Sequence, residues 1–191
     1  TSGSSTAGVG DESKENTAGE GVTAQEAITI SANADTNLDA TAIGAAAGVF
    51  AGDGTGVRLS SDTDAKAFVG KKEKLNAGTD LSVTAKNTPK ISALSTSAAV
   101  GLAGVGITVA MASSDDSAHV SVGDGAALTA GEALTIKAKM AKPTDGKNIN
   151  AHAIAGGGGV VSGAVADVRV NLDQHTDVSI GENAALKGKT A

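Results

Sequence analysis

Apolar and small polar residues alternate in short runs along this chain, and most of the runs end at a glycine. In residues 134–138, apolar side chains occupy every second position, with Thr135 and Lys137 between them. A period of two is typical of a β-strand with one buried side and one side facing water. The pattern therefore predicts strands of about four to six residues, separated by Gly or Gly-Asp-Gly turns.

These strands recur at a fixed offset of 53. Three copies of one strand begin at Ile28, Leu81 and Leu134. A second column precedes them and contains Val22, Leu75 and Leu128. Self-similarity at a fixed period is the sequence signature of a repeat architecture. The sequence therefore predicts an all-β solenoid with repeats at about 22–74, 75–127 and 128–191. Each repeat is expected to hold about three rungs of roughly 18 residues, and about ten rungs would form a rod about 50 Å long.

The third repeat contains five extra residues. Leu38, Ile91 and Ile149 occupy matching positions, and the offset grows from 53 for the first pair to 58 for the second. The insertion is expected in residues 143–148, which have the chemistry of a turn. Near the N-terminus, Val9 matches Val122 at an offset of 113, which requires a seven-residue insertion. Residues 1–21 are rich in Ser, Gly, Thr and Glu and are expected to form a flexible or irregular entry segment.

Half of each repeat is almost free of charge. Residues 91–112 contain no charged side chain, and residues 40–52 and 151–166 are their counterparts. A stretch of this length could span a membrane as a helix. Its high content of Gly, Ser and Thr instead favours strands with small residues on one face and branched residues on the other. A face of small residues would let a second sheet or a neighbouring chain approach closely.

One mismatch remains in the alignment of this half. Val57 matches Ala110, but the larger apolar residues of the second copy, Val109 and Met111, lie one position away from the expected register. A slip of one residue reverses the faces of a strand. The mismatch predicts either a β-bulge or a local error of alignment.

Composition narrows the possible functions. The chain has two Phe, no Tyr, no Trp and no Cys, so disulfides, thiolate metal sites and Cys nucleophiles are excluded. A hydrophobic fraction of 40% argues against general disorder. The net charge of −6 makes a nucleic acid an unfavourable partner.

The most regular polar feature is a column of Asp62, Asp115 and Asp173. Stacked carboxylates could bind Ca²⁺, which prefers six to eight oxygen ligands. The Gly-Gly-x-Gly-x-Asp signature of calcium-binding solenoids is missing, and Asp and Ser are common in ordinary turns. Plain turns are therefore the favoured interpretation, and no cofactor is predicted.

The remaining candidates do not indicate catalysis. His119, His152 and His175 lie at different phases of the repeat, without metal-ligand spacing, and are interpreted as solitary exposed histidines. The glycines at 156–159 are followed by two valines, whereas a phosphate-binding loop requires Gly-Lys-Ser or Gly-Lys-Thr. No catalytic residue is assigned, and the chain is not expected to be an enzyme.

The motif over residues 120–138, Val-x-Val-Gly-Asp-Gly-Ala-x-Leu-x-Ala-Gly-x-x-Leu-x-Ile-x-Ala, resembles the repeats of large bacterial surface adhesins. It is similar to the filamentous-haemagglutinin-like and leukotoxin-like filamentous adhesins. The resemblance implies a right-handed parallel β-helix, export through an outer-membrane pore and a place on the bacterial cell surface. It implies no catalytic residue.

The leading hypothesis is a structural segment of an extracellular bacterial filament or adhesin stalk. Its expected partners are copies of itself or adjoining repeats, end to end or side by side, and a host or bacterial surface. No transmembrane segment is expected. Two alternatives are a solenoid that binds a glycan or protein and a β-helical enzyme that degrades polysaccharide. Attachment lost on mutation of a surface face would favour the first alternative, and measurable cleavage of polysaccharide would favour the second.

Overall fold

The computed structural model describes residues 2–14, 16, 21–143 and 149–189, and these form strands without any helix. The strands lie in three parallel sheets. The front sheet has the order β1 (Ser2–Val9), β4 (Phe50–Val69), β7 (Ala103–Val122) and β11 (Val161–Ile180). The back sheet contains β3 (Ile28–Ala47), β6 (Leu81–Val100), β9 (Leu134–Met140) and β10 (Ile149–Gly158). The base sheet is formed by β2 (Gly21–Ala24), β5 (Lys74–Ala77), β8 (Ala127–Ala130) and β12 (Ala185–Lys187).

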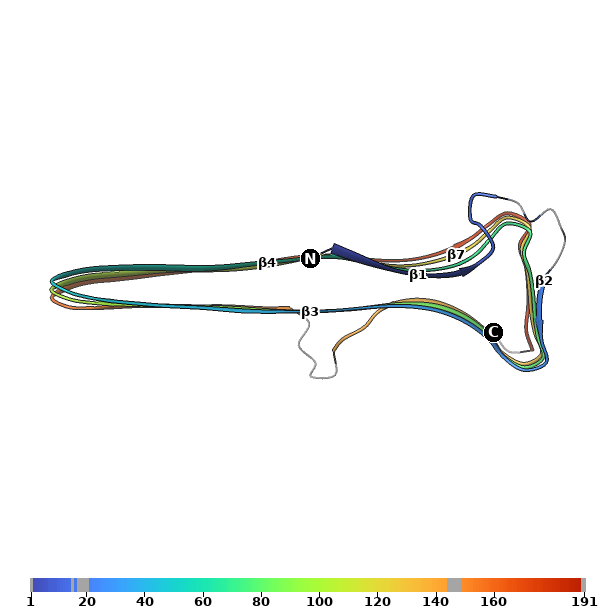
Figure 1. Cartoon of the computed structure of the whole chain (residues 1–191), viewed down its shortest axis with the longest axis horizontal. Helices are drawn as coiled ribbons and strands as arrows, with labels where there is room; N and C mark the ends of the chain where they lie inside the picture. Colours follow the sequence, from blue (N-terminus) through green and yellow to red (C-terminus); the bar gives the residue numbers. More distant parts are fainter. Residues whose placement is uncertain (1, 15, 17–20, 144–148, 190–191) are drawn as a thin grey trace.

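The chain visits the base, back and front sheets in the same order each time. Ile28 pairs with Leu81, and Leu81 pairs with Leu134, each in a parallel ladder. Successive strands therefore lie over one another when the molecule is viewed along the stack (Figure 1). The columns predicted from the sequence are the columns that pair, and the stacked parallel sheets are consistent with a β-solenoid.

The prediction of three short rungs in each repeat is wrong. All three strands of the second unit pair with their counterparts in the first unit at an offset of 53. One unit therefore crosses each sheet once, with one strand of four residues and two of 20 residues. The expected short strands are parts of longer ones, because the polar residues between them continue the strand. Sheets of four strands extend about 15 Å along the stack, and not about 50 Å.

The apparent mismatch in the uncharged half requires no bulge. Val57 pairs with Ala110, and Ala110 pairs with Val168, so the predicted alignment holds. Val57 and Ala110 are buried, whereas Val109 and Met111 are only partly buried on the opposite side of β7. The second unit therefore places small residues inside and branched residues outside.

Both predicted insertions are present. Asn87 pairs with Met140 at an offset of 53, and Ile91 pairs with Ile149 at an offset of 58. The five extra residues thus lie between Met140 and Ile149, and positions 144–148 fall outside the described residues. Val9 pairs with Val69 at an offset of 60, which exceeds 53 by the predicted seven-residue insertion.

The expected irregular entry segment is wrong for Ser2–Val9. These residues form β1, a regular strand that pairs in parallel with residues 62–69 of β4. Small side chains alternate along β1 as they do in later strands, and Ala7 and Val9 pack against the hydrophobic core. The backbone of the first residues is therefore ordered by the same ladder as the repeats.

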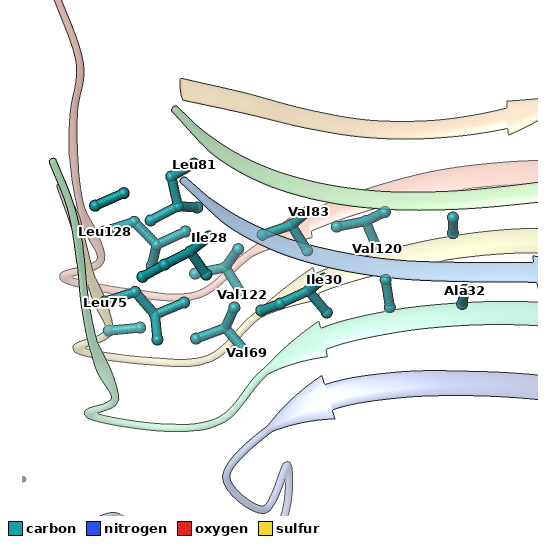
Figure 2. Close-up of a cluster of buried hydrophobic side chains, with 14 of the residues drawn as sticks. Ile28, Ile30, Ala32, Val69, Leu75, Leu81, Val83, Val120, Val122 and Leu128 are labelled. Carbon is teal, nitrogen blue, oxygen red and sulfur yellow. The ribbon is translucent and has the colours of Figure 1, made fainter. Parts of the chain in front are cut away.

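The interior changes character from the wide end of the molecule to the narrow end. The wide end holds the large buried side chains, drawn in Figure 2: Ile28, Ile30, Val69, Leu75, Leu81, Val83, Val120, Val122 and Leu128. At the narrow end, which we call the arm, residues 40–57, 93–110 and 151–168 bring the front and back sheets close together (Figure 1). A Cβ added to Gly106 in β7 would lie 2.4 Å from the carbonyl oxygen of Gly156 in β10. This confirms the prediction that a face of small residues admits a second sheet.

The uncharged stretch at 91–112 belongs to strands β6 and β7, so the alternative of a membrane-spanning helix is wrong for it. Over the described ranges, no helix is long and apolar enough to cross a membrane.

Candidate functional site

The outer face of the front sheet holds the predicted acidic column. Asp62 pairs with Asp115, and Asp115 pairs with Asp173, on three adjacent strands. All three side chains are exposed. They lie within β4, β7 and β11, so their assignment to turns is wrong. The period of two continues through them, and a strand can carry exposed Asp on its outer face.

Stacked carboxylates on neighbouring strands repel one another, because cross-strand partners lie about 5 Å apart. In the part of the chain that the structure describes, no group of three His, Asp or Glu side chains is placed to hold a metal ion. The column therefore presents negative charge to solvent, and its geometry alone points to no calcium site.

Two of the histidines are not solitary. The ring centroids of His119 and His175 lie 5.5 Å apart, and Nε2 of His119 lies 3.9 Å from Oδ1 of Asp64. The Ser117 hydroxyl donates to the same Asp64 oxygen at 2.8 Å. His175 on β11 pairs with Ser117 on β7, two residues before His119, so the two histidines are diagonal neighbours. His152 lies apart from them, exposed on β10 of the back sheet.

A buried carboxylate lies directly behind this face. Asp116 is 1% exposed, and its Oδ1 accepts hydrogen bonds from the Ser61 hydroxyl at 2.9 Å and the Thr63 backbone N–H at 3.0 Å. The Thr63 hydroxyl also donates to Oδ1 at 2.5 Å, and the Ser114 hydroxyl donates to Oδ2. The sequence interpretation missed Asp116. The alternation from Ser114 to Val122 could have identified it, because it places Asp116 on the buried face.

The buried network also joins the two large sheets. The Asn87 side chain on β6 donates to the carbonyl oxygens of Thr63 at 2.9 Å and Ser117 at 3.0 Å. Within the arm, the Thr108 hydroxyl donates to the Ser95 hydroxyl at 2.6 Å. These polar groups satisfy one another inside the fold, so they stabilise the contact between sheets and are closed to a substrate.

Glu12, in the segment after β1, binds side chains of the front sheet. Glu12 contacts Lys66 Nζ at 2.6 Å and accepts a hydrogen bond from the Ser121 hydroxyl at 2.6 Å. Burial raises the pKa of Glu12, but the hydrogen bonds from Lys66 and Ser121 outweigh burial and lower its pKa overall. The carboxylate therefore connects β4 and β7 in its charged form.

A hollow of about 260 Å³ lies on the outer face of the front sheet beside the acidic column. Its lining is formed by Arg58, Met111, Ala112, Ser113, Arg169 and Asn171. Arg169 makes an ion pair with Asp167, with Nη2 and Oδ2 2.9 Å apart. The sequence interpretation missed this feature, although Arg58 and Arg169 occupy one column of the predicted alignment.

Comparison with known proteins adds no functional assignment. No family model, no curated protein and no solved structure matches the chain. The function must therefore be argued from the fold and from the front face.

Proposed function

We propose that the chain is a structural segment of an extracellular bacterial filament or adhesin stalk, without catalysis. In this proposal it is a right-handed parallel β-solenoid in which each 53-residue unit forms one rung. The observation that carries the proposal is the in-register pairing, at an offset of 53, along the whole of β3 with β6 and of β4 with β7. The resemblance of residues 120–138 to adhesin repeats supports the surface location.

The mechanism of such a segment is mechanical. Each rung bonds only to its neighbours, so length and stability increase with every rung. The outermost strand of the front sheet, β11, pairs with β7 on one side only. Val168, Val170 and Leu172 on β11 are 43–60% exposed, while their partners on β7 are buried. A further rung, from an adjoining repeat or a second copy, would cover these side chains and use the free edge of β11.

The proposal predicts how length depends on repeat number. Inserting ten further copies of residues 75–127 should lengthen the particle by about 48 Å, because each added rung contributes about 4.8 Å. Electron microscopy should show thin rods of constant width, and circular dichroism should keep its β-sheet shape. A particle that widens without lengthening, or a helical spectrum, would overturn the proposal.

A further inference from the structure

The two arginines of the chain occupy one column of the front face. Arg58 on β4 and Arg169 on β11 both pair with Met111 on β7, so they flank it from the two neighbouring strands. Strand spacing places their backbones about 10 Å apart, and both line the 260 Å³ hollow. Arginine presents a planar set of donors that matches a carboxylate. The hollow is therefore suited to a carboxylate that approaches above Met111.

Carboxylates of matching spacing lie on the same face. The column of Asp62, Asp115 and Asp173 follows the arginine column by four residues on the same three strands, which is about 13 Å. Between the two columns lies a third, of small polar residues, that contains Ser60, Ser113 and Asn171. The face thus carries a basic column and an acidic column at equal distances from a central column.

We propose that this face binds the same face of a second copy of the chain, with Asp115 of each copy entering the arginine-lined hollow of the other. A twofold axis along the central column would bring β4 opposite β4 with the strands antiparallel. Arg58 then faces Asp62 of the second copy, and Arg169 faces Asp173 of the second copy. Asp115 faces Met111 and lies between the two arginines.

The next columns fit the same arrangement. Asp167 and His175 lie four residues to either side of Asn171, so the axis places them opposite each other across the interface. Asp64 faces Gly56, where even an added Cβ would find its nearest neighbour 3.8 Å away. A twofold axis along the strands would instead bring Arg58 opposite Arg169 and align the acidic columns. Charge complementarity therefore selects one of the two arrangements.

The area of this face limits the affinity. Ten residues of length and three to four strands of width cover about 30 Å by about 15 Å. A stable interface usually buries about 800 Å² on each partner. Association of this chain should therefore be weak, with a dissociation constant in the micromolar range or above, and should weaken further in salt. Longer stacks would add area with every rung.

The test uses two complementary variants of the full chain. In the first, Arg58→Asp and Arg169→Asp remove the basic column, and in the second, Asp62→Arg and Asp173→Arg remove two members of the acidic column. Sedimentation velocity at low salt should show a monomer–dimer equilibrium for the wild type and at least tenfold weaker dimerisation for each variant alone. A 1:1 mixture of the two variants should restore dimerisation at least in part, because positions 58 and 62, and positions 169 and 173, again face each other with opposite charge. Only one of the two Asp115 side chains then enters a hollow lined by arginines. Lys137→Asp with Lys139→Asp on the back sheet is the matched control and should leave dimerisation unchanged.

Three results would overturn the proposal: a monomeric wild type up to about 1 mM, undiminished dimerisation of either single-column variant, or a mixture that stays monomeric. Loss of dimerisation in the back-sheet control would also overturn it, because the effect would then be one of net charge. The substitutions leave all strand edges intact, so end-to-end growth remains measurable in every variant. Failure of this proposal is thus distinguishable from failure of the stalk proposal.

Discussion

Replacing Asp116 should destabilise the fold more than replacing any exposed carboxylate. Asp116→Ala removes the acceptor of four hydrogen bonds inside the fold. The three hydroxyl donors can rotate, but the Thr63 backbone N–H is fixed by β4 and would stay buried without a partner. An orphaned buried donor costs about 1–3 kcal/mol, and each lost hydrogen bond contributes about 1 kcal/mol. Three lost hydroxyl bonds and one orphaned N–H together give an expected loss of about 4–6 kcal/mol.

Asp116→Asn separates the roles of charge and hydrogen bonding. The amide keeps an oxygen toward Ser61 and Thr63 and offers an N–H₂ group to the Ser114 hydroxyl, which can accept as well as donate. The expected cost is therefore only about 1 kcal/mol. Asp115→Ala is the matched control, since Asp115 is the adjacent residue on the same strand but faces solvent. Removing it from a column of like charges should change stability by less than about 0.5 kcal/mol.

Urea unfolding followed by circular dichroism measures these differences. With a denaturant slope of about 2–3 kcal/mol/M, Asp116→Ala should lower the midpoint by about 1.3–3 M. Equal midpoints for Asp115→Ala and Asp116→Ala would refute the network as a source of stability. A loss in Asp116→Asn as large as in Asp116→Ala would instead refute the argument that hydrogen bonds, and not charge, carry the effect.

Three further predictions concern the backbone, the arm and pH. Lys72 has φ of 57° at the position where Gly125 has 67°, so Lys72→Gly should raise the thermal midpoint by about 2–4 °C, and Gly125→Lys should lower it. Gly106→Ala should cost about 1–3 kcal/mol in urea unfolding because of the contact with Gly156, whereas Gly54→Ala should be neutral, since an added Cβ there meets nothing within 4 Å. Because the folded pKa of Glu12 is lowered, its contribution is fully present above its unfolded pKa of about 4.5 and is lost as the pH falls through the lower folded pKa. Glu12→Gln should therefore lower the thermal midpoint more at pH 7 than at pH 3, and equal differences at both pH values would contradict this.

The columns of the fold were predictable, but its rungs were not. Residues 53 apart were recognisable because each column keeps its apolar or small character, as in Val22, Leu75 and Leu128. The number of residues in one rung depends on whether a run of polar residues ends a strand or lies within it. Ser61 and Asp116 satisfy each other only across neighbouring strands, and hydropathy along the chain cannot report that partnership. From hydropathy alone, the polar runs therefore predict turns that would divide the two long strands of each unit into short pieces.

The same limit applies to the candidate site. Asp62, Asp115 and Asp173 were placed in one column correctly, because the offsets of 53 and 58 suffice for that. The alignment also shows the column of Arg58 and Arg169. Its relation to the acidic column can be inferred only when the strands are known to be long and continuous. A continuous strand fixes both columns on one outer face at a known distance. Turns at residues 61–64 would have pointed the acidic column elsewhere.

The exposed branched residues of the arm follow from its thinness. Where the Gly106 backbone approaches Gly156, little space remains between the sheets, so the inner positions nearby, such as Ala99 and Gly104, hold small residues. Val105 and Ile107 then face outward and remain 46–47% exposed. β-branched residues favour extended strands. On this outer face Ile107 pairs with Val165, whereas Val105 lies between Gly52 and Gly163. The arm is therefore stabilised mainly by its ladders, with a small apolar cluster around Val57 and Ala93 and no large side chains inside it.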